Sequence, residues 1–202
     1  MRFLPRVDSG HLATFGGVPS LPRPDEGLSD GVLTLRPWSP ELLPVLVERL
    51  NDPAIARFTR VPSPYTQAHA EAYMAEMEDR RRSGEELALV TTDAVTGEPL
   101  GTHNLRMTSW EHARGELGAT VFPQARGRSV SSRAGLLLTR YAIECVGLVR
   151  VEIYAATDNI AVQRACEKWN IHKREGTLRS YIEQDGRRVD LILYAALAED
   201  LP

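Results

Sequence analysis

The stretch from residue 121 to residue 134 constrains the fold of this chain more than any other. It reads VFPQARGRSVSSRA: a strand that ends at Pro123, a short basic loop with one glycine, and a helix start rich in serine. Such a turn directs several backbone N–H groups and the positive end of a helix at one point. That arrangement suits a pyrophosphate, although a plain turn would also explain the pattern. The stretch predicts a strand–loop–helix unit.

Composition narrows the class of protein. The 202 residues suffice for one domain with a sizeable core, and the charged and hydrophobic fractions, 25% and 43%, are typical of globular proteins. A net charge of −3 is too small to indicate a nucleic-acid or membrane partner. Pro5 interrupts the N-terminal segment and no long apolar run follows, so we expect a cytoplasmic location. Cys145 and Cys166 indicate reduced thiols, and no metal-ligand spacing is present.

Two regions differ in their patterning. Residues 1–29 are rich in glycine, proline and serine, which predicts a flexible N-terminal extension before a single domain over residues 30–202. The alternative is an arm that packs on its own or a partner's domain through Phe3, Leu4, Leu12, Phe15 and Leu21. The domain's periodicities predict the order β-α-α-β-β-β-α-β-α-β-β. We expect strands at 32–36, 86–92, 99–107, 116–122, 149–155, from 173 and at 189–197, and helices at 39–50, 66–82, about 132–146 and 160–169.

Several motifs resemble one family. The loop fits the pattern Q/R-x-x-G-x-G/A of the GNAT superfamily, the Gcn5-related N-acetyltransferases, with Gln124, Gly127 and Ser129 at the fixed positions. Ser129 stands where glycine or alanine is usual. Residues 158–171, 174–179 and 185–194 also resemble family segments, as does the Pro-Tyr-Thr at 64–66. Over roughly residues 31–197 the chain is similar to the RimJ/RimL-type branch.

The resemblance implies an α/β GNAT fold: a mixed, mostly antiparallel twisted sheet of about seven strands flanked by about four helices. It also implies an N-acyltransferase that moves an acyl group, expected to be acetyl, from a CoA thioester to a primary amine of a small molecule or protein. In that fold the strand 117–122 splays from the strand 151–155, and the gap admits the pantetheine arm. The residues implied for CoA are Thr120, Val121, Phe122, Gln124, Arg126, Gly127, Arg128, Ser129, Val130, Ser131, Ser132 and Asn159.

The catalytic residues are less constrained. Val162 stands where this branch commonly has serine, whose hydroxyl can protonate the departing thiolate. Cys166 lies one helical turn later, as a thiol acid or as a buried structural cysteine. The candidate general bases are Glu116, His103, His112, Tyr181 and Glu183. Glu116 could instead form a salt bridge, His103 could be a satisfied strand histidine, and a water chain could replace a single base.

Two further functions stay open. An acyl group on a phosphopantetheinyl carrier protein could replace acyl-CoA, in which case the Ser129 loop would matter less. The chain could also be a non-catalytic GNAT-fold domain that binds CoA or a partner, because Val162 cannot donate a proton and no base is assigned. The acceptor amine and a possible homodimer are not determined by the sequence.

Overall fold

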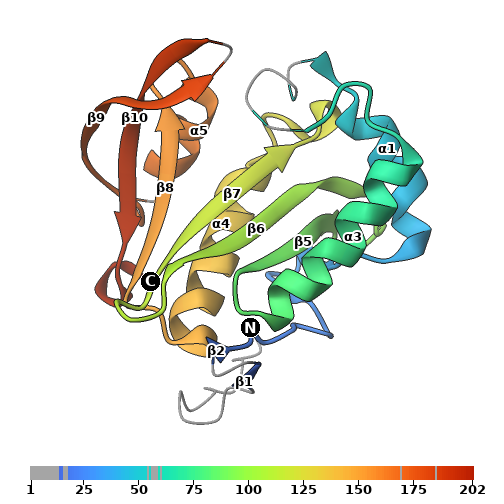
Figure 1. Cartoon of the computed structure of the whole chain (residues 1–202), viewed down its shortest axis with the longest axis horizontal. Coiled ribbons are helices and arrows are strands. Elements are labelled where there is room, and N and C mark those ends of the chain that lie inside the picture. The colour runs from blue at the N-terminus through green and yellow to red at the C-terminus, as the bar shows by residue number, and fades with distance from the viewer. Residues whose placement is uncertain are drawn as a thin grey trace.

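The architecture comes from a computed structural model that describes residues 14–15, 18–53, 55, 59, 61–168, 170–184 and 186–202. Its main sheet has eight strands in the order β3-β4-β5-β6-β7-β8-β10-β9 (Figure 1). These are β3 (Leu28–Ser29), β4 (Leu33–Pro37), β5 (Glu86–Asp93), β6 (Pro99–Ser109), β7 (Arg114–Val121), β8 (Arg150–Ala156), β9 (Lys173–Gln184) and β10 (Arg187–Ala196). A separate short ladder joins β1 (Thr14–Phe15) to β2 (Val18–Pro19).

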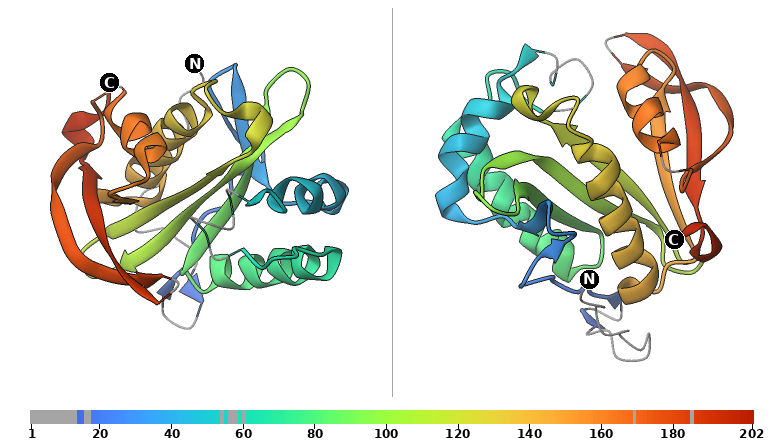
Figure 2. Two further views of the ribbon diagram at one scale, coloured as in Figure 1. Left: turned by 90° about the horizontal axis from the view of Figure 1, so that it is seen from above. Right: turned by 180° about the vertical axis from the view of Figure 1, so that it is seen from behind.

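Helices cover both faces of the sheet (Figure 2). On one face lie α1 (Leu43–Leu50) and α3 (Gln67–Arg82), and on the other lie α4 (Val130–Tyr141) and α5 (Ile160–Glu167). The expected α/β GNAT architecture with four helices is therefore confirmed for the described residues. The sheet has one strand more than expected because the short β3 pairs with β4 ahead of the predicted first strand. In the part of the chain that is described, no helix has the length and apolar character needed to cross a membrane.

The sheet is split between two neighbouring inner strands, β7 and β8. They are parallel neighbours, but their pairing covers only Arg114↔Arg150, Gly115↔Val151 and Glu116↔Glu152. Beyond this point β7 stays paired with β6 and β8 stays paired with β10, so the two strands diverge (Figure 1). The predicted splay of strand 117–122 from strand 151–155 is confirmed.

Local sequence signals explain most helix boundaries. Thr66 caps α3 as predicted: its hydroxyl accepts a hydrogen bond from the His69 N–H, and the His69 ring accepts one from the Thr66 N–H. Ser39, expected to cap the first helix, stands at the N-cap position of the helical segment, but its side chain makes no capping hydrogen bond. Its hydroxyl donates to the Glu41 carboxylate, and a 3₁₀ turn over Pro40–Leu42 precedes α1. Trp169, the expected end of the last helix, lies outside the described residues.

The segment ahead of β3 packs on the domain. Leu21 is fully buried, its N–H donates to Arg81 O at 3.0 Å, and its carbonyl accepts from Arg81 Nη1 at 2.7 Å. The Tyr141 hydroxyl donates to Pro22 O at 2.5 Å. These contacts of Leu21 and Pro22 are of the kind that the packed-arm alternative predicts. The other expected anchors, Phe3, Leu4, Leu12 and the Phe15 side chain, lie outside the described part.

Candidate active site

A cavity of about 550 Å³ lies where β7 and β8 diverge, and its lining comes from both faces of the sheet. Strand alternation and core contacts assign the lining to two lobes. The lobe on the α1/α3 face, called the α3 lobe, includes Trp38, Tyr65, Tyr73, Arg80, Glu86, Asn104, Glu116 and Tyr154. The lobe on the α4/α5 face, called the α4 lobe, includes His103, Leu117, Ala119, Ser131, Ser132, Val162, Ala165 and Cys166.

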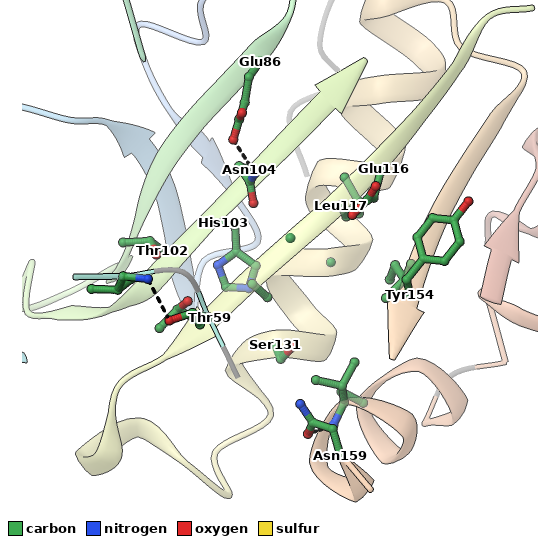
Figure 3. A pocket seen from close by; sticks show the side chains of 18 of the residues that line it. Thr59, Glu86, Thr102, His103, Asn104, Glu116, Leu117, Ser131, Tyr154 and Asn159 are labelled. Atoms are coloured by element: carbon green, nitrogen blue, oxygen red, sulfur yellow. Dashed lines mark hydrogen bonds between the residues drawn. The ribbon is translucent and has the colours of Figure 1, made fainter. Parts of the chain in front are cut away.

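The α3 lobe contains a buried polar network centred on Glu86. The Asn104 amide donates to Glu86 Oε1, and Arg80 Nη1 lies 3.0 Å from Glu86 Oε2 (Figure 3). Gly118 faces Asn104 across the β6–β7 pair, and a Cβ at Gly118 would collide with the Asn104 Oδ1. The missing side chain at Gly118 is therefore what makes room for the amide. Beside this network, burial raises the pKa of Tyr73, so its hydroxyl stays protonated.

Glu86 also belongs to a row of charged residues across four strands. The register places Glu86 opposite Arg106, Arg106 opposite Glu116, and Glu116 opposite Glu152. Arg106 forms an ion pair with Glu116, while Glu152 accepts from the Tyr154 hydroxyl at 2.9 Å. Both of the alternatives weighed for Glu116 have support here, because its carboxylate lines the cavity and also forms a salt bridge.

Three other base candidates lie outside the cavity lining. Tyr181 is half exposed and stacks on Tyr154, with ring centroids 5.6 Å apart, so it contacts a lining residue without lining the cavity itself. Glu183 is exposed and lies opposite Arg188 in the β9–β10 hairpin. His112 is exposed in the turn between β6 and β7. The geometry does not bring these three side chains to the divergence of β7 and β8.

The loop before α4 has the backbone that a diphosphate site requires. Gly127 has φ +78°, and Ser129 adopts a left-handed conformation with φ 63°. The first bond of the helix ladder runs from Arg133 N–H to Ser129 O at 3.1 Å, which leaves the N–H groups of the first helical turn without a partner in the ladder. Val130, Ser131 and Ser132 provide these groups.

The basic side chains of the loop are directed to partners outside it. Arg126 bonds Asp52 at 3.0 Å and Arg128 approaches Asp93 at 3.6 Å. Gln124 donates to Pro99 O at 3.4 Å and so ties the loop to the start of β6. The Ser129 hydroxyl accepts a hydrogen bond from the Lys168 ammonium. The backbone, more than these side chains, faces the space before the helix.

The backbone expectations for β7 need a correction at Phe122. The Phe122 N–H donates to Leu100 O and its carbonyl accepts from the Ala125 N–H, both at 2.9 Å, so neither group is left for a ligand. Because N–H directions alternate along a strand, the Thr120 N–H also points to β6. The Leu117 N–H belongs to the last step of the β7–β8 ladder, opposite Glu152. The N–H groups that point into the divergence belong to Ala119 and Val121, of which the sequence analysis named only Val121.

The helix α5 closes the α4 lobe. The Asn159 side chain caps this helix by accepting from the Val162 N–H at 3.4 Å, and its amide also lines the cavity. Cys166 is 4% exposed and packs with Val162, Ala155 and Tyr194. Burial raises the pKa of the Cys166 thiol to about 12. Cys166 is therefore a buried, protonated thiol that also lines the cavity.

His103 is a partly satisfied strand histidine. Its Nδ1 lies 2.7 Å from the Thr91 hydroxyl, whereas its Nε2 is buried without a hydrogen-bond partner in the described structure. Burial lowers the pKa of His103 to about 4, so the ring is neutral near pH 7. No cluster of three or more metal-ligating side chains is found among the described residues.

A parallel strand pair that splits beside a helix N-terminus, with a cavity at the split, is the arrangement that the GNAT resemblance implies for an acyltransferase. A family model described as acetyltransferase (GNAT) domain matches residues 32–171. The chain belongs to this family, the GNAT N-acetyltransferases.

Individual relatives agree with this assignment. The chain is 25% identical over 169 residues to the uncharacterized N-acetyltransferase p20 of Bacillus licheniformis, covering 83% of this chain and 94% of that one. Mycobacterium smegmatis RimJ, solved with CoA-disulfide, has a TM-score of 0.76 at 22% identity, with 85% of each chain covered. Spermidine N-acetyltransferase from Vibrio cholerae, solved with CoA and spermine, has a TM-score of 0.71 at 18% identity, covering 85% and 99%. The similarity to the RimJ/RimL-type branch is confirmed at the level of fold.

Proposed function

We propose that this chain transfers an acyl group, in the first instance acetyl, from a CoA thioester to a primary amine. The observation that carries the proposal is the cavity at the β7–β8 divergence, which has a lobe on each face of the sheet. The α4 lobe begins at a helix N-terminus, where backbone N–H groups suit a diphosphate. The α3 lobe offers carboxylates, which suit an ammonium group.

The residues of this chain fit such a donor. A CoA thioester supplies a carbonyl carbon that an amine can attack. The N–H groups of Ala119 and Val121 point into the divergence and can donate to oxygens of the arm and of the thioester. The Asn159 amide lies at the same opening, because Asn159 lines the cavity beside Val162. Holding the two reactants at this point supplies orientation, a large part of the rate in such reactions.

On the acceptor side, the chain can orient an amine and remove its proton. Glu116 is the last residue of β7 that pairs with β8, and it lines the cavity, so its carboxylate stands at the start of the divergence. Glu86, held by Asn104 and Arg80, gives a second fixed carboxylate in the same lobe. We propose Glu116 as the residue that accepts the proton, directly or through water. Each of these two carboxylates already forms an ion pair with an arginine. The lobe therefore suits an acceptor with one ammonium group better than a polyamine with several.

The experiment is a thiol-release assay with acetyl-CoA and a panel of primary amines, with CoA binding measured separately by calorimetry. Gly127→Asp should abolish CoA binding, because it adds a negative charge where a diphosphate must sit. Gly186→Asp is the matched control, since Gly186 has a similar φ, +73°, and equally open surroundings in the β9–β10 hairpin. Equal CoA affinity in wild type and Gly127→Asp would reject the donor site.

The same assay separates the rival functions. Transfer from an acylated carrier protein with no transfer from acetyl-CoA would indicate the carrier-dependent enzyme. CoA binding with no transfer to any amine would indicate a non-catalytic domain.

A further inference from the structure

His103 is a buried group in the α4 lobe that neither the fold nor the proposed chemistry uses. It is 3% exposed, lines the cavity and sits on β6 between Thr102 and Asn104 (Figure 3). Its Nε2 has no hydrogen-bond partner among the described residues. Folded proteins seldom leave a buried polar atom unpaired, so an unpaired atom in a cavity wall is a position where a water or a ligand group completes the hydrogen bond.

The hydrogen-bond partner of the other ring nitrogen decides what Nε2 can offer. Thr91 is fully buried, and its hydroxyl bonds His103 Nδ1. If Nδ1 carried the proton, the Thr91 hydroxyl would need a second acceptor to use its own hydrogen. If the Thr91 hydroxyl donates to Nδ1 instead, its hydrogen is in a hydrogen bond. The only polar hydrogen of the two side chains without an acceptor is then the one on Nε2. We assign the proton to Nε2 on this ground, so His103 presents an N–H to the cavity.

The strand pairing of His103 places its Nε2–H beside the path that a bound CoA thioester would take. A donor must run from the N-terminus of α4, at Val130–Ser132, to the divergence beside Leu117. Ala119 lies between these ends on β7, and His103 is the residue paired with Ala119 on β6, on the same face. Because Ala119 has a small side chain, the imidazole is not screened from the lobe by its neighbour.

We infer that His103 Nε2–H donates a hydrogen bond to an amide carbonyl oxygen of the pantetheine arm. The inference rests on the proposed function, because it requires a pantetheine donor in the α4 lobe. It gives His103 a binding role in place of the general-base role considered from the sequence. A lone pair on Nδ1 is committed to Thr91, and Nε2 carries a proton, so neither nitrogen can accept a proton from the amine.

The test compares ligands with and without the arm. Calorimetry measures CoA, 4′-phosphopantetheine and 3′,5′-ADP, which lacks the arm, against wild type, His103→Phe and His103→Gln. His103→Phe keeps an aromatic ring but has no N–H. It also leaves the Thr91 hydroxyl without its acceptor, so the double variant His103→Phe/Thr91→Val removes that hydroxyl as well. We expect His103→Phe, alone or with Thr91→Val, to weaken CoA and 4′-phosphopantetheine roughly 3- to 10-fold, with 3′,5′-ADP unchanged. His103→Gln should recover part of the loss.

The outcomes separate the inference from the proposed function. An equal loss for CoA and 3′,5′-ADP, or no loss for either, would overturn the role of His103 while the donor site stands. Failure of wild type to bind either CoA or 4′-phosphopantetheine would overturn both. Nitrogen-15 NMR of the ring adds an independent readout: the Nε2 signal should be that of a protonated nitrogen and should shift with CoA but not with 3′,5′-ADP. An unprotonated Nε2 would contradict the inference.

Discussion

Asn104 and Gly118 face each other across β6 and β7 so closely that a single methyl group cannot be added between them. A Cβ at Gly118 would lie well inside the 3.0 Å that such atoms keep from other heavy atoms, and its nearest neighbour would be Asn104 Oδ1. Asn104 in turn donates to Glu86. The acceptor-facing carboxylate thus depends on the absence of a side chain two strands away.

Gly118→Ala should therefore displace the Asn104 amide and release Glu86. We expect the free energy of unfolding to fall by roughly 1–3 kcal/mol, as for other overpacked sites, and kcat/KM for the amine to fall more than CoA affinity. Removing the obstacle in the double variant Gly118→Ala/Asn104→Ala should recover stability, so the two changes should not be additive. Additive losses in denaturant unfolding would show that the pair does not interact.

Ser129 is a second site of backbone constraint, at the N-cap of α4. A non-glycine residue at φ 63° costs about 1 kcal/mol, so Ser129→Gly should leave the melting temperature unchanged or raise it slightly. CoA affinity should stay within a few-fold. Ser129→Ala is the informative partner, because it keeps the constraint and removes the hydroxyl that Lys168 contacts. A large loss of CoA binding in both variants would mean that the hydroxyl itself binds the phosphate.

Cys166 should behave as a core residue. With its pKa raised to about 12, the thiol stays protonated at any pH suitable for assay. Cys166→Ala should lower the free energy of unfolding by about 1 kcal/mol and leave kcat nearly unchanged. Stability should also fall as pH rises from about 9 to 12, because the unfolded chain releases the thiol proton first. A drop in kcat of about 10²-fold in a variant that melts normally would instead make Cys166 the acid.

Two buried histidines should make the fold sensitive to acid. Burial lowers the pKa of His103 and of His172 to about 4, against 6.5 for an ordinary histidine. Between these values the unfolded chain binds more protons, so the free energy of unfolding falls as pH drops, by at most about 1.4 kcal/mol per unit for each histidine. Urea unfolding across pH 4–7 should show this slope, and His172→Gln should reduce it. If the slope is the same in His172→Gln as in wild type, other residues cause the acid sensitivity.

Glu116→Gln tests the acceptor side. The amide keeps the size and a hydrogen bond to its surroundings but cannot take a proton, so kcat/KM for the amine should fall by about 10²-fold with CoA affinity retained. Glu183→Gln is the matched control, because Glu183 is exposed outside the cavity lining. If Glu116→Gln retains both the rate and the acidic limb of the pH–rate profile, the base is a water chain or another residue.

Much of the fold could be predicted from the sequence. The Thr66 capping box and the Pro123–Ser129 loop are local signals, and both appear where the residues predict them. The split of the sheet followed from the family resemblance. At Ser39 only the position of the cap was predicted correctly, since its hydroxyl donates to Glu41 and accepts no bond from the helix backbone.

The candidate site was harder to predict because it depends on register. Glu86, Arg106, Glu116 and Glu152 are far apart in the chain, and only strand pairing brings them into one row. A charged residue opening a buried strand, as Glu86 does, was the available signal. The Phe122 expectation failed for a similar reason, since the alternation of N–H directions depends on which residue of β6 lies opposite.

The segment around Leu21 and Pro22 has a practical consequence for anyone who shortens this chain. It bonds Arg81 on the helix of one face and Tyr141 on the helix of the other, so it links the two helical layers at the edge of the sheet. Starting the protein at residue 30, where the sequence pattern changes, would remove these contacts between the two helical layers. A shortened protein for crystallisation should keep Leu21 and Pro22 together with the β1–β2 ladder, with any affinity tag placed upstream of Thr14.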